Sequence, residues 1–111
     1  MISQSTALQI VSAVKDVCGY DINYISVNGI IEASTDESRI GDFHEVGYMA
    51  AKNNTTMEVF EDSQYDGTMK GVNIPFSYHG ETVSVIGITG EPEQVRKYAN
   101  LALRIMRLIR Y

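Results

Sequence analysis

The chain has few of the residues on which disulfides, metal centres and membrane anchors depend. Cys18 is its one cysteine, which excludes an internal disulfide and a multi-cysteine metal site. No apolar run approaches the length that crosses a membrane, and residues 1–18 mix Ser, Gln, Lys and Asp among their apolar positions, unlike a secretory signal. We therefore expect a cytoplasmic protein.

The short motifs of common enzyme classes are also missing. There is no Gly-rich phosphate loop, no nucleophile elbow and no metal-ligand spacing. His44 and Glu45 are adjacent, so on a helix their side chains point in different directions and do not form a base with its orienting partner. We expect no catalytic activity, no cofactor and no metal.

Basic residues are scarce outside one end of the chain. The net charge is −5, and five of the nine Lys and Arg residues lie in residues 96–111, which contain no acid. The acidic remainder disfavours direct contact with nucleic acid. The basic residues lie beside a wide apolar face, which indicates the solvated flank of a docked helix rather than a membrane-binding segment.

What is present is a sequence of ordinary domain size. The 111 residues are 44% hydrophobic, enough for a single core, and no internal repeat, low-complexity tract or linker divides them. We predict one domain over residues 1–111. Its predicted elements are helices over 5–18, 43–53 and 92–111 and strands over 22–27, 30–34, 56–60, 71–78 and 81–90.

Two turns and one proline organise the predicted strands. Asn28-Gly29 suits a two-residue hairpin turn, and His79-Gly80 separates the two longest strands. Pro75 cannot donate to a ladder, so it indicates an edge position, a bulge or an interruption. The element order predicts an α+β fold with an antiparallel sheet of about five strands. The 43–53 helix would cover the face opposite the terminal helices and leave a small cavity above the sheet.

The final helix is apolar over roughly half its circumference, more than packing on one sheet requires. One stripe is expected to pack on the domain and the other on a second subunit, which favours a homodimer formed through the terminal helices. A helix deeply covered within the monomer would explain the same pattern. The first stripe contains Val95, Ala99, Ala102, Met106 and Ile109, and the second contains Tyr98, Leu101, Ile105 and Leu108.

Residues 39–45 (RIGDFHE) place an arginine, a glycine and the start of a helix close together. Exposed N–H groups in a first helical turn and the positive end of the helix dipole favour a carboxylate or phosphate, and Arg39 can add a bidentate contact. The same residues also form an ordinary capping box, in which Asp42 and Glu45 satisfy the helix's own donors. The spacing alone leaves both interpretations open.

Together with residues 71–75 (GVNIP) and 85–93 (VIGITGEPE), this segment resembles the sugar diacid recognition domain. The resemblance extends to residues 9–11 and 22–23, so it covers nearly all of residues 5–110. Members of this family are similar in fold to PAS and Cache sensors. They usually form the N-terminal part of bacterial transcriptional regulators of carbohydrate diacid use, ahead of a helix-turn-helix output. The resemblance implies glucarate, galactarate or glycerate as ligand, and an output domain outside residues 1–111.

The resemblance also implies a pocket between residues 39–45 and the long hairpin. Arg39 would bind a carboxylate, with backbone N–H groups at the helix start adding donors. Asn73 and Thr89 would contact hydroxyl groups, and Gly87 would let the ligand approach its strand. His44 would be neutral, because a helix N-terminus disfavours the charged ring. The implied ligand-binding residues are Ser34, Arg39, Gly41, Phe43, His44, Asn73, Gly87 and Thr89.

Each of these residues could instead have a purely structural role. Arg39 can pair with Asp36 or Asp42 at the surface. The corresponding roles are packing for Phe43, His44 and Gly87, a backbone contact near Pro75 for Asn73, a helix cap for Thr89 and a turn contact for Ser34.

The leading hypothesis is a ligand sensor. Its ligand would order the helix after Gly41 and shift how the first and last helices pack in a dimer. The rival hypothesis is a PAS-like dimerisation or interaction module that has no diacid ligand or takes a different small carboxylate.

Overall fold

The computed structural model of this chain describes residues 2–109. Three α-helices, one 3₁₀ helix and five strands follow one another along these residues. In chain order the elements are α1 (Gln4–Cys18), β1 (Ile22–Ile25), β2 (Ile31–Ser34), η1 (Glu37–Arg39), α2 (Glu45–Asn53), β3 (Met57–Val59), β4 (Gly71–Tyr78), β5 (Glu81–Thr89) and α3 (Pro92–Leu108).

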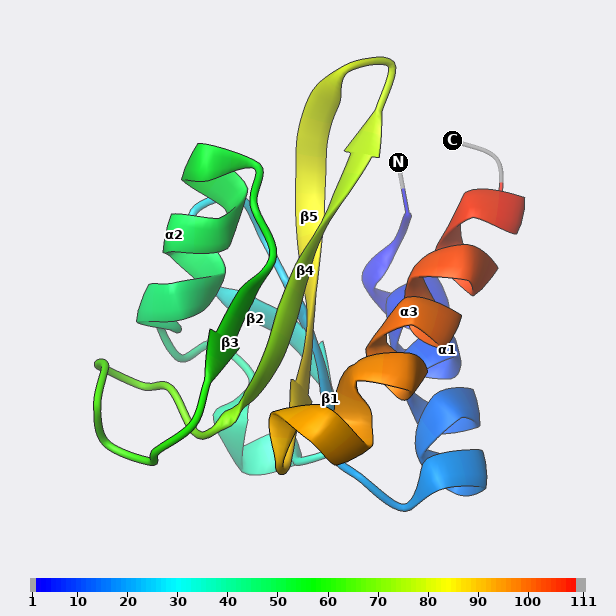
Figure 1. The fold of residues 1–111 in the computed structure, drawn as a ribbon. Coiled ribbons are helices and arrows are strands. Elements are labelled where there is room, and N and C mark those ends of the chain that lie inside the picture. The colour runs from blue at the N-terminus through cyan, green and yellow to red at the C-terminus, as the bar shows by residue number, and fades with distance from the viewer. Residues whose placement is uncertain (1, 110–111) are drawn as a thin grey trace.

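The five strands form one antiparallel sheet with the order β2-β1-β5-β4-β3. Helices α1 and α3 lie side by side on one face, and α2 covers the other (Figure 1). The predicted α+β fold, with terminal helices together and a covering helix between the second and third strands, is therefore confirmed.

Local sequence signals account for where the terminal helices begin and end. The Ser3 side chain accepts a hydrogen bond from the backbone N–H of Thr6 at the start of α1, and Gly19 ends the helix in the left-handed conformation, with φ of 81°. Pro92 occupies the first turn of α3, where its missing N–H costs nothing. The predicted extension of this helix to Tyr111 lies partly outside the described residues.

The two hairpins differ in how they turn. His79 and Gly80 both have positive φ, 51° and 82°, as a two-residue hairpin loop requires. At the other predicted turn only Gly29 has positive φ, and its N–H donates to the carbonyl of Ser26 at 2.9 Å. The first hairpin therefore has a longer loop than predicted, and its strands are correspondingly shorter.

The core has two parts, one on each face of the sheet. The larger lies between the sheet and the α1–α3 pair, and the smaller lies beneath α2. Burial of these apolar side chains is the main force that holds the helices to the sheet. The smaller cluster contains Ile25, Ile31, Ala50, Ala51 and Val85, with Met57 packed against it.

Helix α3 buries most of its first apolar stripe and only part of the second, of which Tyr98 and Ile105 pack against the core. Val95, Ala99, Ala102 and Met106 are fully buried, with 0% of their surface exposed. On the second stripe Leu108 is 83% exposed and Leu101 is 38% exposed. Within residues 2–109 the monomer therefore does not cover this helix completely, and the homodimer stays a prediction.

Two local features differ from the prediction. Helix α2 begins at Glu45 rather than at Phe43, and the 3₁₀ helix η1 was not predicted. Cys18 is half-buried, and its sulfur accepts a hydrogen bond from the N–H of Tyr20. Pro75 fits the predicted edge position, because β3 pairs with β4 only over Gly71–Asn73 and Pro75 lies beyond it.

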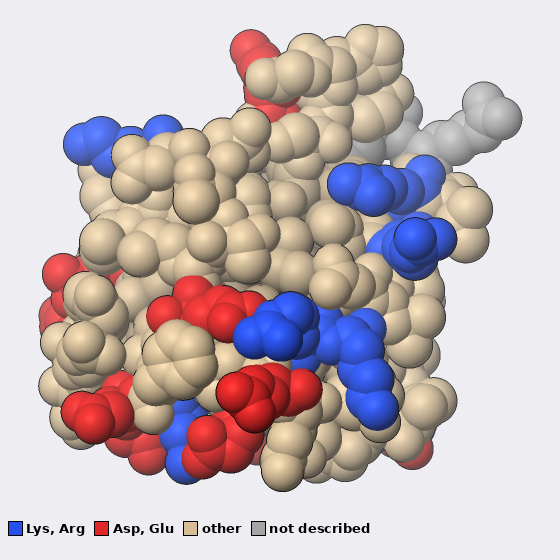
Figure 2. Space-filling view, viewed as in Figure 1, with Lys and Arg blue, Asp and Glu red and all other residues tan. Residues whose placement is uncertain are grey.

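Charge is unevenly distributed on the surface. Basic side chains gather over α3, while acidic side chains gather on the lower part of the face that contains the β3–β4 loop (Figure 2). Within residues 2–109, no helix is both long enough and apolar enough to cross a membrane.

Candidate functional site

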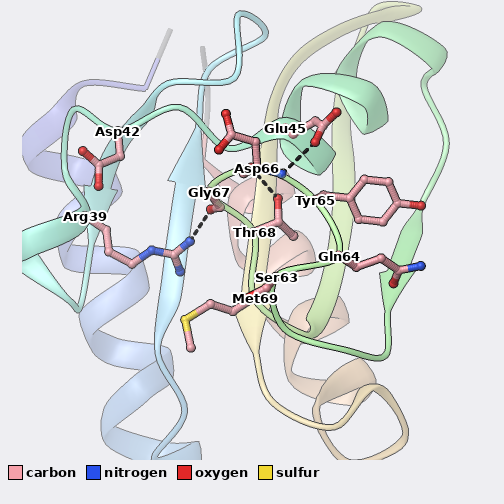
Figure 3. A pocket seen from close by; sticks show the side chains of 10 residues that line it. All are labelled: Arg39, Asp42, Glu45, Ser63, Gln64, Tyr65, Asp66, Gly67, Thr68 and Met69. Carbon is pink, nitrogen blue, oxygen red and sulfur yellow. Dashed lines mark hydrogen bonds between the residues drawn. The ribbon is translucent and has the colours of Figure 1, made fainter.

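A cavity of about 520 Å³ opens between the segment that leads into α2 and the β3–β4 loop (Figure 3). Its size is within the range of small-molecule sites. Arg39 contributes the positive charge, and Asp42, Glu45 and Asp66 contribute carboxylates. The lining residues are Arg39, Asp42, Glu45 and residues 63–69.

Arg39 points across this cavity and binds a neutral group. Its Nη2 donates to the carbonyl oxygen of Gly67 at 2.8 Å (Figure 3). Among residues 2–109, no carboxylate lies within ion-pair distance of it, so the alternative role of Arg39, a surface pair with Asp36 or Asp42, is not found. The charge of Arg39 is therefore available to an anionic ligand that displaces one carbonyl.

The N–H groups at the start of α2 are already bonded within the protein. Glu45 N donates to the carbonyl of Asp66 at 3.0 Å, and Val46 N donates to Oγ1 of Thr68 at 3.3 Å. The expectation of free donors at this terminus is therefore wrong for this conformation. The β3–β4 loop occupies the positions that an anion would take at a helix N-terminus.

The helix cap is His44, and not Asp42 as the capping-box interpretation supposed. Nδ1 of His44 accepts from the N–H of Gly47 at 2.9 Å. The carboxylate of Glu45 instead accepts from the backbone N–H of Asp66 at 2.7 Å. Asp66 of the β3–β4 loop therefore bonds to Glu45 of α2 twice, since its carbonyl accepts from the N–H of Glu45 and its own N–H donates to the Glu45 carboxylate.

His44 is buried and neutral. Burial, with a smaller contribution from the charge of Arg39, lowers the pKa of its ring to about 4. Because Nδ1 accepts a hydrogen bond, the single ring proton resides on Nε2. Within the described part of the chain, Nε2 makes no hydrogen bond although His44 is only 3% exposed.

A row of buried polar residues crosses the sheet beneath α2. The strand register aligns Ser34, Asn23, Gly87 and Asn73 on neighbouring strands β2, β1, β5 and β4. Oγ of Ser34 donates to Oδ1 of Asn23 at 2.6 Å, and Nδ2 of Asn73 makes a long bond of 3.4 Å to the carbonyl of Met57. Nδ2 of Asn23 has no partner in residues 2–109, although Asn23 is only 2% exposed.

Two glycines let α2 and the sheet approach each other closely. A Cβ on Gly87 would lie 2.8 Å from Oδ1 of Asn73 and 3.3 Å from Cδ1 of Ile25. A Cβ on Gly47 would lie 2.9 Å from the same Ile25 atom. The side chain of Ile25 therefore fills the space between the glycines, and the cavity lies beside the polar row rather than directly over it.

The family described as putative sugar diacid recognition matches residues 2–109. The chain belongs to this family. A carbohydrate diacid regulator of Escherichia coli (strain K12) is 35% identical over 98 residues, which are 86% of this chain and 25% of the regulator. An uncharacterized protein of Haemophilus influenzae is 30% identical over 107 residues, covering 94% of this chain and 29% of that protein.

This sugar diacid recognition domain spans only about a quarter of the length of the curated relatives that it matches. Its fold is shared with proteins of much lower identity. A GAF domain from an Acinetobacter phosphoenolpyruvate-protein phosphotransferase has a TM-score of 0.64 at 9% identity, covering 100% of this chain and 88% of that one. A free methionine-R-sulfoxide reductase of Thermoplasma acidophilum has a TM-score of 0.65 at 16% identity, covering 95% and 90%.

Of the eight predicted site residues, Arg39 alone lines the cavity of this family member, while Ser34, Asn73 and Gly87 lie in the polar row and His44 is the cap of α2. Gly41 is exposed, with φ of 93°, and lines a separate groove. Phe43 is 41% exposed and packs near Tyr48, with ring centroids 6.1 Å apart. Thr89 ends β5 opposite Gly71 and does not cap α3, whose N-cap Glu91 makes no side-chain capping bond.

Two parts of the candidate site were missed by the sequence-based prediction. Asn23 is a polar residue in an apolar strand, and that contrast was the available signal. The loop around Gly67 was not part of the predicted site. Its signal was Gly67 itself, where φ is 61° and a Cβ would lie 2.0 Å from the carbonyl oxygen of Phe43.

Proposed function

We propose that this chain is the small-molecule sensor domain of a cytoplasmic bacterial transcriptional regulator. Its ligand is a sugar diacid or hydroxy acid of the glucarate, galactarate or glycerate type. The observation that carries the proposal is Arg39, a cation in a ligand-sized cavity that is bonded to a carbonyl and not to a carboxylate. Membership of the sugar diacid recognition family supports the same class of ligand.

The first carboxylate of the ligand replaces the carbonyl of Gly67 at Arg39. A charge-assisted, bidentate contact is stronger than a hydrogen bond to a neutral carbonyl, so the exchange favours binding. If the loop moves away, the N–H groups of Glu45 and Val46 also become available to the carboxylate.

The acidic lining selects for hydroxyl groups on the remainder of the ligand. Asp42, Glu45 and Asp66 oppose a simple anion but accept hydrogen bonds from a polyol. Succinate has a similar charge but no hydroxyl group. It can therefore bind Arg39, but it cannot offset the repulsion from the three carboxylates by donating hydrogen bonds to them. Preference for hydroxylated acids therefore follows from the charges around Arg39.

The buried polar row provides the second group of contacts. Nδ2 of Asn23 and Nε2 of His44 are donors without partners in the described chain, and Ser34 and Asn73 lie in the same row. A ligand that reaches them must displace the side chain of Ile25 from between Gly47 and Gly87. The hydrogen bonds gained there offset the cost of this rearrangement.

The loop is tied to α3, which provides a route for a signal. The N–H of Gly90 donates to the carbonyl of Lys70 at 3.0 Å, and Nζ of Lys70 contacts Glu91 at 2.5 Å. Arg96 on α3 also makes a two-armed contact with Glu58 on β3, at 2.5 and 2.8 Å. Ligand-driven movement of the loop shifts α3 and biases a homodimer formed through its exposed stripe.

The second candidate function is a dimerisation module without a diacid ligand, or with a different small carboxylate. The exposed Leu101 and Leu108 favour it, because exposed apolar side chains on one side of a helix are typical of an interface. In both functions this domain makes no direct contact with nucleic acid or membrane, and it catalyses no reaction.

The deciding experiment is thermal unfolding with glucarate, galactarate, glycerate, succinate and glucose, for the wild type and for Arg39→Ala. A ligand at ~100 times its dissociation constant stabilises by about 2.7 kcal/mol, which is a shift of many degrees in a small domain. We expect hydroxy acids to stabilise the wild type and to have no effect on Arg39→Ala. Arg104→Ala on α3 is the matched control and should respond as the wild type does.

Loss of the hydroxy-acid shift only in Arg39→Ala supports the sensor. No shift with any acid in the wild type contradicts it and favours the dimerisation module. Mass spectrometry of the recovered ligand tests the absence of catalysis, since consumption of the acid would identify an enzyme instead.

A further inference from the structure

We propose a second ligand site, chemically opposite to the first, in a groove between the start of α1 and the β1–β2 hairpin. The groove has a volume of about 670 Å³, within the usual range for small-molecule sites. It takes a small, largely apolar molecule that is neutral or cationic and carries one hydrogen-bonding group. Its walls are mainly aliphatic and include Ile2, Val27, Ile30, Ile31, Ile40 and Val83.

The hydroxyl group of Tyr24 is the specific feature of this groove. Tyr24 lines it and is only 4% exposed, yet its hydroxyl has no hydrogen-bond partner among residues 2–109. By contrast, the hydroxyl of Tyr20 bonds to Oε1 of Gln94 at 3.2 Å. Among the described side chains, only Oγ of Ser84 is both fully buried and unpaired, so the Tyr24 hydroxyl remains accessible from the groove. A ligand that pairs with it therefore gains a hydrogen bond in an otherwise apolar setting.

The charge at the rim excludes the ligands of the first site. Among residues 2–109, Glu32 is the one charged residue that lines the groove, and none of the described Lys or Arg residues lines it. Nε2 of Gln4 donates to the main-chain carbonyl of Glu32 at 2.7 Å, so the carboxylate itself is left uncompensated by this contact. A carboxylate ligand is therefore disfavoured here, and an ammonium or a neutral hydroxyl is favoured.

The groove is separate from the cavity of Arg39. Arg39 and Asp42 line the cavity, whereas Ile40 and Gly41, between them in sequence, line the groove. The N–H of Gly41 donates to the carbonyl of Ile31 at 2.8 Å, which fixes this segment as the wall between the two spaces. Occupation of one site therefore does not require occupation of the other.

The test uses ¹H–¹⁵N spectra of the whole chain titrated with p-cresol, benzylamine and benzoate at millimolar concentration. These probes share one ring and differ in their polar group. We expect p-cresol and benzylamine to shift the amides of Val27, Ile30 and Val83, which are not adjacent in sequence to Arg39, and benzoate to leave them unchanged. Absence of shifts with the first two, or equal binding of benzoate, would overturn the proposal.

Two variants link the binding to the named groups. Tyr24→Phe should weaken p-cresol about fivefold, the factor expected for one hydrogen bond of ordinary strength, while Tyr98→Phe is the control that keeps wild-type affinity. Glu32→Gln should weaken benzylamine and leave p-cresol unchanged, with Glu37→Gln as its control. Unchanged p-cresol affinity in Tyr24→Phe would refute the role of the hydroxyl. If Tyr24→Phe does not fold, Glu32→Gln decides the matter, because Glu32 is exposed.

Discussion

The guanidinium of Arg39 donates a hydrogen bond of 2.8 Å to the carbonyl of Gly67, which lies 28 residues later in the chain. This bond closes the β3–β4 loop over the start of α2. Gly67 also has φ of 61° and touches the backbone of Phe43. A change of backbone conformation at Gly67 would therefore break this bond and free the guanidinium of Arg39.

Gly67→Ala tests this closure. A methyl group at Gly67 would lie 2.0 Å from the carbonyl oxygen of Phe43, so the loop has to open. The matched control is Gly80→Ala, whose φ of 82° is as unfavourable but whose Cβ meets nothing within 4 Å. We expect Gly80→Ala to cost about 1 kcal/mol and Gly67→Ala at least twice that, measured by urea unfolding. Equal costs would show that the contact with Phe43 is unimportant.

Gly87→Ala tests the close approach at the polar row. Its Cβ would lie 2.8 Å from Oδ1 of Asn73, so the substitution destabilises the fold while that amide is present. In an Asn73→Ala background the clash is removed, and the cost of Gly87→Ala should fall by about 1 kcal/mol. Chemical denaturation of the four proteins in this cycle gives the coupling, and strict additivity would disprove it.

The buried His44 predicts a pH dependence of stability. Its folded pKa of about 4 is below the ordinary value of 6.5, so between these values the unfolded chain binds more protons than the folded one. Stability should therefore fall as pH decreases from 6.5 to 4, by at most about 3 kcal/mol. Unfolding curves across this range measure the effect.

His44→Asn should remove most of this dependence while retaining a side chain that can cap α2. His79→Asn is the control, because His79 lies in the exposed hairpin turn and should leave the slope unchanged. A steep slope that persists in His44→Asn would assign the dependence to other groups.

The exposed stripe of α3 predicts the effect of a charge on self-association. Leu108→Glu, alone or with Leu101→Glu, should convert a dimer to a monomer in sedimentation experiments, since both side chains are solvent-exposed in the monomer and their loss does not disturb the core. Phe60→Glu, at a residue that is 58% exposed after β3, is the control. A wild type that sediments as a monomer at all concentrations would exclude the homodimer.

Local signals predicted most of the fold. Gly19 ends α1 and His79-Gly80 makes the turn of the long hairpin, because these residues favour particular backbone conformations wherever they occur. The start of α2 was predicted less well. His44 caps this helix through its ring, a role that depends on burial and on the neighbouring loop rather than on residue type alone.

The candidate site was predictable only in part. The cation was identified at Arg39, and the small residue that permits close packing was identified at Gly87. The partner of Arg39, the carbonyl of Gly67, was not, because any residue can supply a main-chain carbonyl and the sequence carries no mark of it. Asn23 was missed for a related reason, since the strand register that aligns it with Gly87 and Asn73 is a property of long-range pairing.

The sequence by itself determined the class of fold, the family, and the chemical groups available to a ligand, because these follow from periodicity, turn residues and the ordered motifs at residues 39–45, 71–75 and 85–93. Only the tertiary structure decided which of these groups face one another. It placed the β3–β4 loop on the donors of α2, and the side chain of Ile25 between Gly47 and Gly87. Such contacts join residues distant in sequence, and their geometry depends on how the whole chain packs.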